Sequence, residues 1–300
     1  MVEVTCRTIQ GRFLLKPSSE LRSIIVGVLA RAQRLYLVEI HAFVFLSNHY
    51  HLLMSVENTR QMARFMNYVN SNLAREAGRL HQWNEKFWGR RYQAIVVSEE
   101  EVAQVNRLRY LLSHGCKEGL VSRPEDWPGA QCVEALLSGK ELEGLWFDRT
   151  RECAARIGGD RPVRLRFVTQ ETVLLSPLPC WKHLSEDSYR KHIQSLVKEI
   201  VTETAMHHER NGTRPLGARA ISEQHPKDRP AKLKKALAPS FHAATRKARG
   251  ELEEAYRWFL RSYRRAARLL AAGDRRARFP EGSFPPPLPF VEWTNGLTPG

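Results

Sequence analysis

The sequence contains no run of about 18 apolar residues, the length that a membrane-spanning helix needs. Met1–Val4 also lacks the basic and then apolar segments that mark a signal peptide. Cysteine is scarce, and no two cysteines form a Cys-x-x-Cys pair; they are Cys6, Cys116, Cys132, Cys153 and Cys180. Because isolated cysteines are typical of a reducing compartment, we expect a cytoplasmic protein without a disulfide framework, a zinc knuckle or a membrane partner.

Acidic residues are in short supply in the second half of the chain. The 300 residues carry 47 Lys and Arg against 32 Asp and Glu, a net charge of +15. Residues 1–150 hold 19 basic and 16 acidic side chains, and residues 151–300 hold 28 and 16, so +12 falls on the second half. Such an excess favours a polyanionic partner, most often nucleic acid, which would make the protein nucleoid-associated. A basic surface that only keeps the protein soluble is the alternative.

Hydrophobic periodicity predicts the order of elements in the first 135 residues. Strand-like runs cover residues 2–15, 37–46, 49–56 and 87–97. Apolar residues at helical spacing follow the predicted cap Ser18-Ser19-Glu20, and two further helices are predicted at about 60–80 and 98–114. The order β-α-β-β-α-β, followed by a further helix, is that of a ferredoxin-like fold. We therefore predict an α+β domain over residues 1–135, in which helices cover one face of an antiparallel sheet.

The rest of the chain is less clearly patterned. Residues 136–182 are predicted to be a linker or irregular segment, in which 161–169 has the pattern of a strand. Residues 183–300 are predicted to form a basic, mainly helical accessory region, with helices at about 185–210 and 251–272. A polyproline-like tail at 284–293 either packs on the fold or binds nothing.

A predicted hairpin carries the first chemical signal. Two strand-like runs flank Ser47-Asn48, which indicates a tight turn. Alternate side chains of a strand share a face, so His49 and His51 project together from the start of the second strand. Two imidazoles on one face form half of a metal site. Packing or an ordinary hydrogen bond is the alternative explanation for such a pair.

The helix predicted for residues 98–114 offers a third ligand and a nucleophile. Tyr110 and His114 are four residues apart and therefore share a helix face. If this helix crosses the sheet, His114 reaches the two strand histidines and Tyr110 lies beside the metal. The alternative is a half-buried structural tyrosine and a histidine that favours the helix C-terminus.

These motifs resemble those of the single-tyrosine HUH transposases, which include the IS200-like enzymes and the REP-associated tyrosine transposases. The resemblance covers roughly residues 1–135 and is carried by Ser-Asn-His-Tyr-His-Leu-Leu at 47–53, Leu-Arg-Tyr-Leu-Leu-Ser-His-Gly-Cys-Lys-Glu-Gly-Leu-Val at 108–121 and Ser-Arg-Pro-Glu-Asp-Trp-Pro at 122–128. The chain departs from the family at Leu46-Ser47, where Met-Pro is frequent, and at His114-Gly115, where related members often have Asn-Pro.

The resemblance implies the HUH endonuclease fold and a transposase that cleaves and rejoins single-stranded DNA. By position, His49 and His51 match the metal-binding histidines, Tyr110 the nucleophile and His114 the third ligand. A phenol of pKa about 10 is a poor nucleophile at neutral pH, and a divalent ion, Mg²⁺ or Mn²⁺ by the resemblance, would polarise the scissile phosphate. Attack would leave a covalent 5′-phosphotyrosine, which conserves the phosphodiester energy for strand transfer. The expected partner is single-stranded or hairpin DNA; whether Tyr110 acts in cis or in trans within a homodimer is left open.

Two clusters are candidates for contacts to DNA. The first mixes cations with aromatic rings, a combination that stacks on bases and neutralises phosphates of a single strand; it consists of Trp88, Arg90, Arg91 and Tyr92. The second is an arginine face on the last predicted helix; it consists of Arg257, Arg261, Arg264, Arg265 and Arg268. A basic strand edge and a solvated helix face are the alternatives, and Tyr92 is a rival nucleophile.

Two other functions compete with the transposase. A ferredoxin-like module that binds nucleic acid without chemistry, such as a domesticated transposase, would not need His49, His51 and Tyr110 together. A metal hydrolase that activates water would not need Tyr110. If residues 150–300 are an accessory DNA-binding region, their deletion is expected to weaken binding and flatten its salt dependence while leaving cleavage of excess oligonucleotide.

Overall fold

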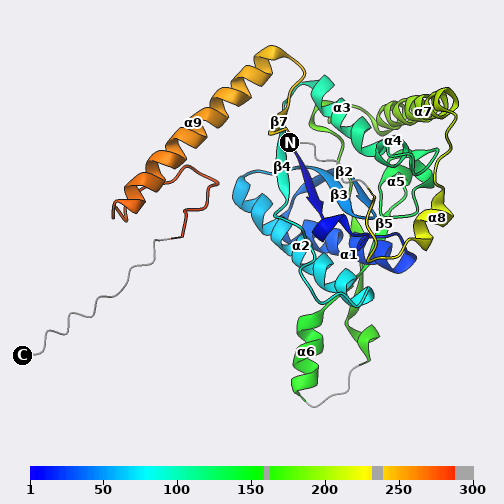
Figure 1. Ribbon diagram of the computed structural model, residues 1–300, viewed down its shortest axis with the longest axis horizontal. Helices are drawn as coiled ribbons and strands as arrows, with labels where there is room; N and C mark the ends of the chain where they lie inside the picture. The colour runs from blue at the N-terminus through cyan, green and yellow to red at the C-terminus, as the bar shows by residue number, and fades with distance from the viewer. Residues whose placement is uncertain (159–162, 232–238, 288–300) are drawn as a thin grey trace, which may run out of the picture.

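The computed structural model describes residues 1–158, 163–231 and 239–287, and its first part is the predicted ferredoxin-like unit (Figure 1). Four strands form an antiparallel sheet in the order β2-β3-β1-β4. The elements of this unit are β1 (Val2–Arg7), α1 (Ser19–Tyr36), β2 (Glu39–Leu46), β3 (His49–Ser55), α2 (Thr59–Leu80), β4 (Gln93–Val97) and α3 (Glu101–Leu112). The predicted α+β class is thereby confirmed.

Polar side chains fix where the first helices begin. The Ser18 hydroxyl accepts a hydrogen bond from the Leu21 backbone N–H at 3.1 Å and caps α1. Asn58 caps α2 in the same way, with Gln61 as donor at 2.9 Å. Each cap satisfies a backbone N–H that has no partner within its helix.

Two predicted strands are shorter than expected. β1 ends at Arg7, because a tight turn at Ile9–Gly11 follows, with Gln10 in the left-handed region at φ 53°. The predicted strand 87–97 is regular only from Gln93 onward, and before it a single bridge joins Trp88 to Thr8.

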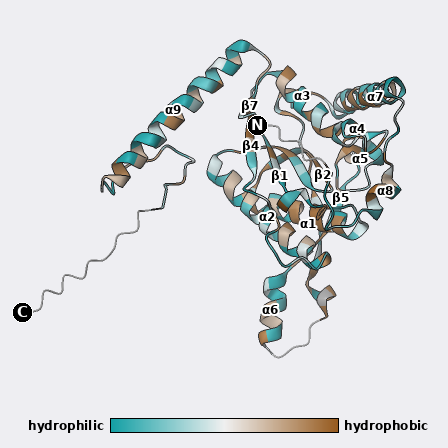
Figure 2. Cartoon of the chain, viewed as in Figure 1, coloured by the Kyte–Doolittle hydropathy of each residue, from teal (hydrophilic) through white to brown (hydrophobic). Residues whose placement is uncertain are grey.

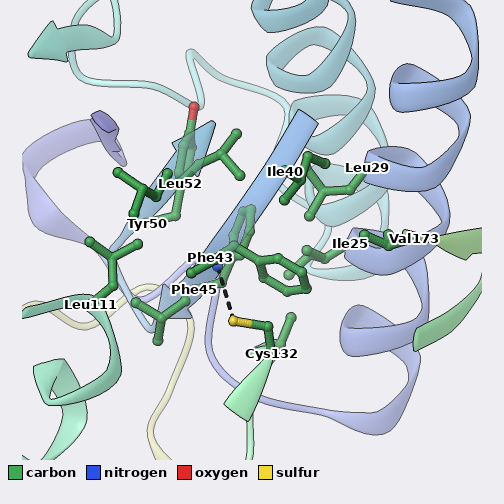
Figure 3. Packing of buried hydrophobic residues seen from close by; sticks show 14 of the residues in the cluster. Ile25, Leu29, Ile40, Phe43, Phe45, Tyr50, Leu52, Leu111, Cys132 and Val173 are labelled. Carbon is green, nitrogen blue, oxygen red and sulfur yellow. Dashed lines mark hydrogen bonds between the residues drawn. The ribbon is translucent and has the colours of Figure 1, made fainter. Parts of the chain in front are cut away.

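The sheet has two unlike faces, and helices cover both of them. One face carries Phe43, Phe45, Tyr50 and Leu52, each at most 1% exposed and packed under α1 and α2 (Figure 3). The Tyr50 hydroxyl donates to Asn70 of α2 at 2.8 Å. The opposite face, which carries the strand histidines, is covered by α3. The prediction that helices lie on one face therefore holds for α1 and α2 and is corrected for α3, whose own apolar side must also be buried.

Residues 136–182, which were predicted to be irregular, contain a hairpin that packs on α1. Its strands, β5 (Leu142–Phe147) and β6 (Val168–Val173), are antiparallel. Arg31 and Arg34 of α1 pair with Glu171 of β6 at 3.0 and 2.8 Å. Residues 161 and 162 of the predicted strand 161–169 lie outside the described residues. The elements between α3 and the end of this segment are α4 (His114–Lys117), α5 (Val133–Ser138), β5 (Leu142–Phe147), α6 (Arg149–Ile157) and β6 (Val168–Val173).

The basic second half of the chain is mainly helical, as predicted. α7 packs against α3 and α4, where Arg109 pairs with Glu203. α9 extends away from the sheet (Figure 1) and is hydrophilic over most of its length (Figure 2). The predicted tail 284–293 is described only up to residue 287. The elements of this half are α7 (Glu186–Asn211), α8 (Ala218–Glu223), β7 (Phe241–His242) and α9 (Arg246–Ala271).

β7 was not predicted. It pairs in parallel with β4 and adds a fifth strand to the sheet edge. The division into residues 1–135, 136–182 and 183–300 stays a prediction. Within the described residues, no helix is long and apolar enough to cross a membrane.

The closest approach between α1 and the hairpin generates the first prediction. A Cβ at Gly27 would overlap the backbone of Leu145, and one at Gly144 would overlap the backbone of Gly27. We expect Gly27→Ala to lower the free energy of unfolding by about 3 kcal/mol, because backbone must move to admit the methyl group. Urea denaturation followed by circular dichroism measures this loss.

The matched control is Gly250→Ala in α9, where a Cβ meets no atom within 4 Å. There alanine favours the helix by about 1 kcal/mol over glycine, so no destabilisation is expected. Equal effects of the two substitutions would show that α1 and β5 do not touch at Gly27.

Candidate active site

The three predicted histidines meet on the α3 side of the sheet. His49 and His51 project from β3, and His114 begins α4 directly after α3. The Nε2 atoms of His49 and His114 are 2.9 Å apart, and the ring centroids of His51 and His114 are 4.5 Å apart. One nitrogen from each ring lies within 4.8 Å of the others, so the described residues bring together a set that can hold a metal ion.

Neighbouring oxygens orient the two strand histidines for metal binding. Nδ1 of His49 is 2.6 Å from Oδ1 of Asn48, and Nδ1 of His51 is 2.7 Å from Oε1 of Glu3. Both oxygens accept a hydrogen bond from Nδ1, which leaves Nε2 of each ring as the nitrogen that can bind a metal ion. Such outer partners fix the tautomer and raise the basicity of a ligating histidine. The donor set therefore fits a divalent ion held by three imidazoles.

Glu3 is the buried charge behind this site. It is 1% exposed, and its carboxylate contacts His51, Arg107 and His242. Burial opposes its ionisation, but hydrogen bonds from His242 and His51 and the charge of Arg107 outweigh burial and hold the pKa of Glu3 well below its usual range. Glu3 is thus a carboxylate at neutral pH and favours the Nδ1 proton of His51.

Tyr110 lies against the histidines, as predicted. Its ring centroid is 5.5 Å from that of His51 and 5.1 Å from that of His114. The Arg107 guanidinium lies over the ring, 4.2 Å from its centroid, and Nζ of Lys117 is 4.9 Å from the centroid. Burial and the charge of Glu3 raise the pKa of Tyr110, whereas Arg107 acts in the opposite direction. The phenol is therefore protonated at neutral pH and needs activation to attack a phosphate.

The site opens into a cavity of about 920 Å³. The three histidines and Tyr110 line it, together with basic side chains that suit an anionic ligand. Its wall is completed by residues from far along the chain, among them Gln224, Pro230, Pro239 and His242. The basic side chains are Arg7, Arg90, Arg91 and Arg107.

The predicted DNA contacts lie in two places. Arg90 and Arg91 are exposed and line the cavity. Trp88 instead packs on Tyr50, and its indole N–H donates to the backbone oxygen of Asn70 at 2.9 Å. Tyr92 is partly buried under Arg91, whose guanidinium lies 5.6 Å from its ring centroid.

The second predicted set projects from α9. Arg257, Arg261, Arg264, Arg265 and Arg268 are all exposed, and Arg257 pairs with Glu253 at 3.5 Å. They are outside the cavity that holds the histidines.

Four residues of the site were not predicted. Arg107 precedes Tyr110 by three residues, so helical spacing could have identified it. Glu3 shares the strand alternation that brings its side chain to the face of His51. Asn48 was recognised only as part of the turn. No local signal identified His242, which enters from β7.

Part of the chain is similar to known proteins. Residues 10–111, about a third of the chain, match the family model described as "Transposase IS200 like". The search of curated proteins found no match.

Two solved structures are similar to part of the chain. One is a REP-associated tyrosine transposase bound to a REP hairpin, at 15% identity and TM-score 0.37, covering 46% of this chain and 78% of that one. Another is a proposed transposase from Deinococcus radiodurans R1, at 17% identity and TM-score 0.27, covering 36% and 85%.

The histidine cluster generates the second prediction. Loss of a residue that only hydrogen-bonds to a metal ligand typically lowers metal affinity about 10–100-fold. His51→Ala removes a proposed ligand itself, so we expect it to weaken Mn²⁺ binding by more than this. Isothermal titration of the metal-free protein with Mn²⁺ measures the affinity. His207→Ala, which removes an exposed histidine of α7, should bind as wild type does; equal losses in both variants would exclude the cluster as the metal site.

Proposed function

We propose that this protein is a transposase that cleaves single-stranded DNA through Tyr110 and transfers the strand, with a divalent metal ion on His49, His51 and His114. The observation that carries the proposal is the contact of the Tyr110 ring with His51 and His114 of the metal-competent cluster. The match to the IS200-like transposase family supports the same reaction class. Mg²⁺ or Mn²⁺ is the proposed ion, as the family resemblance implies.

The proposed reaction is a transesterification. The Tyr110 oxygen forms a bond to phosphorus, the bond from phosphorus to the 3′-oxygen breaks, and that oxygen takes up a proton to become a free 3′-hydroxyl. When bound, the ion would polarise the phosphate and stabilise the charge that develops on it. Reversal with another 3′-hydroxyl would rejoin the strands without a separate energy source.

The surroundings of Tyr110 explain why its hydroxyl must be activated before it can attack a phosphate. Burial and Glu3 raise its pKa, so the phenolate is rare at neutral pH without a counter-charge. Arg107 and Lys117 flank the ring and favour the ionised form. We propose that Tyr110 acts in cis, because its ring contacts histidines of the same chain.

Single-stranded DNA is the proposed occupant of the cavity. Arg7, Arg90 and Arg91 line it and would neutralise phosphates near Tyr110. Trp88 and Tyr92 belong to the same segment, and stacking of bases on them stays a prediction, since both rings pack against the core.

The arginine face of α9 is the proposed contact for a duplex or hairpin stem. Arg257, Arg261, Arg264 and Arg268 follow one another at steps of three and four, so they share a side of the helix. This side is exposed and suits a phosphate backbone. A protein that only binds nucleic acid would need these cations and not the cluster around Tyr110.

Covalent capture of DNA tests the chemistry. We would incubate the protein with pooled single-stranded oligonucleotides from the sequence flanking its gene, with Mn²⁺ or Mg²⁺, and look for an SDS-resistant adduct. Tyr110→Phe and EDTA should each abolish the adduct, since one removes the nucleophile and the other the metal. Tyr92→Phe is the matched control and should keep it. Cleavage that survives Tyr110→Phe would point to a water-using hydrolase, or to Tyr92 if Tyr92→Phe abolished it.

Salt dependence tests the arginine face. Replacing Arg261, Arg264 and Arg268 with Gln should reduce the slope of log affinity for a hairpin against log salt by about 2 to 3, because each lost phosphate contact releases about one counterion fewer. Fluorescence anisotropy at several salt concentrations measures the slope.

The charge-matched control replaces Arg210, Arg214 and Arg219, which are exposed on α7, α8 and the loop between them. It should leave the slope nearly unchanged. The same slope change in both triple variants would mean that net charge, and not α9, determines binding.

A further inference from the structure

The C-terminal half of the chain enters the candidate active site at one point, β7. Phe241 and His242 pair with Val96 and Val97 of β4, and the Ser98 N–H donates to the His242 carbonyl at 2.9 Å. This places residue 242 at the sheet edge, next to the cluster of titratable groups behind the metal ligands.

The chain forms hydrogen bonds to the first part of the protein both before and after β7. After it, the backbone N–H groups of Ala244 and Thr245 donate to the Glu100 carboxylate at 2.7 and 3.1 Å. Before it, the Phe13 N–H donates to the Asp228 carbonyl at 2.9 Å, and the Ser47 hydroxyl donates to Gln224 at 3.0 Å. The chain is therefore hydrogen-bonded to the sheet and its neighbouring loops at residues 224 and 228 and again at 242, 244 and 245.

The His242 ring contacts the two charged groups behind the site. Its Nε2 is 3.2 Å from Oε2 of Glu3 and 2.7 Å from Nη1 of Arg107, so this nitrogen donates to Glu3 when it is protonated and accepts from Arg107 when it is not. Arg107 in turn is 3.3 Å from the same oxygen of Glu3. The three side chains thus contact one another, and all three line the cavity.

Glu3 and Arg107 connect the proposed metal site with the proposed nucleophile. The other oxygen of Glu3 holds Nδ1 of His51, a proposed metal ligand, and the guanidinium of Arg107 lies over the ring of Tyr110, the proposed nucleophile. A buried carboxylate keeps its place only where its oxygens are paired. Loss of one partner would let Glu3 and Arg107 shift, and both contacts depend on their positions.

We propose that His242 is a positioning residue of the active site, which holds Glu3 and Arg107 in place for His51 and Tyr110. The inference rests on the proposed function, because it assigns a role to the groups that carry it. It also revises the expectation that deleting the second half of the chain spares cleavage. Such a deletion removes His242 as well as the arginine face, so point variants are needed to separate the two effects.

The test compares two substitutions in the full-length protein. His242→Leu keeps the side-chain volume and removes the polar contacts, whereas His242→Gln keeps a donor and an acceptor near Glu3 and Arg107. Outer-shell partners are worth about 10–100-fold in metal affinity. His242 contacts Glu3, which in turn contacts the proposed ligand His51, so its effect on the metal is less direct. We therefore expect His242→Leu to raise the Mn²⁺ dissociation constant about threefold to tenfold. His242→Gln should stay within about twofold of wild type.

Isothermal titration with Mn²⁺ and thermal unfolding are measured on the same samples. His225→Ala, an exposed histidine of the preceding segment, is the control and should bind Mn²⁺ as wild type does. If His242→Leu fails to fold, His242→Asn replaces it, because this side chain is polar but too short to reach Glu3. Unchanged Mn²⁺ affinity in a folded Leu or Asn variant, or an equal loss in the Gln variant, would overturn the assignment.

The two proposals fail differently. If wild type binds no Mn²⁺ and forms no adduct with DNA, the proposed function is wrong. If wild type does both, and the folded Leu or Asn variant matches it in Mn²⁺ affinity and adduct rate, only the role of His242 is wrong.

Discussion

The buried carboxylate of Glu3 is the group on which the candidate site depends. It is removed from water on β1 and is kept ionised by partners from three other elements: His51 on β3, Arg107 on α3 and His242 on β7. An unpaired charge at this position would be costly, so the carboxylate fixes these elements relative to one another. The Glu3 contacts therefore give His51, the proposed metal ligand, and Tyr110, the proposed nucleophile, a common support.

The two-faced sheet makes this arrangement compatible with a stable core. Side chains alternate along β3, so Tyr50 and Leu52 pack under α1 and α2 while His49 and His51 face α3. The apolar face supplies the burial that holds the sheet together (Figure 3), and the polar face is left for chemistry. A shift of the β2–β3 register by one residue would exchange the faces, and the two-residue turn at Ser47-Asn48 opposes it.

Local patterns predicted most elements of the first 100 residues. The Ser18 cap, the hairpin at Ser47-Asn48 and the apolar stripe of α2 are each determined by neighbours within a few residues, so they can be read from the chain. The same holds for His49, His51, Tyr110 and His114, because strand and helix spacing place each pair on one face. The strand predicted to begin at residue 87 is regular only from Gln93, and the β5–β6 hairpin was not predicted. Both depend on packing against distant segments, such as those around Thr8 and Gly27.

The sequence by itself determined the ferredoxin-like order, the tight hairpin and the residue types of the metal cluster, since all depend on short-range periodicity and on the chemistry of imidazole and phenol. Only the tertiary structure decided that α3 covers the face opposite α1 and α2, and that Glu3 and Arg107 join the two halves of the site. The same is true of β7, which brings His242 beside Glu3 across 239 positions of sequence. A contact between residues so far apart leaves no local pattern, because it is selected by burial and charge pairing in the folded chain.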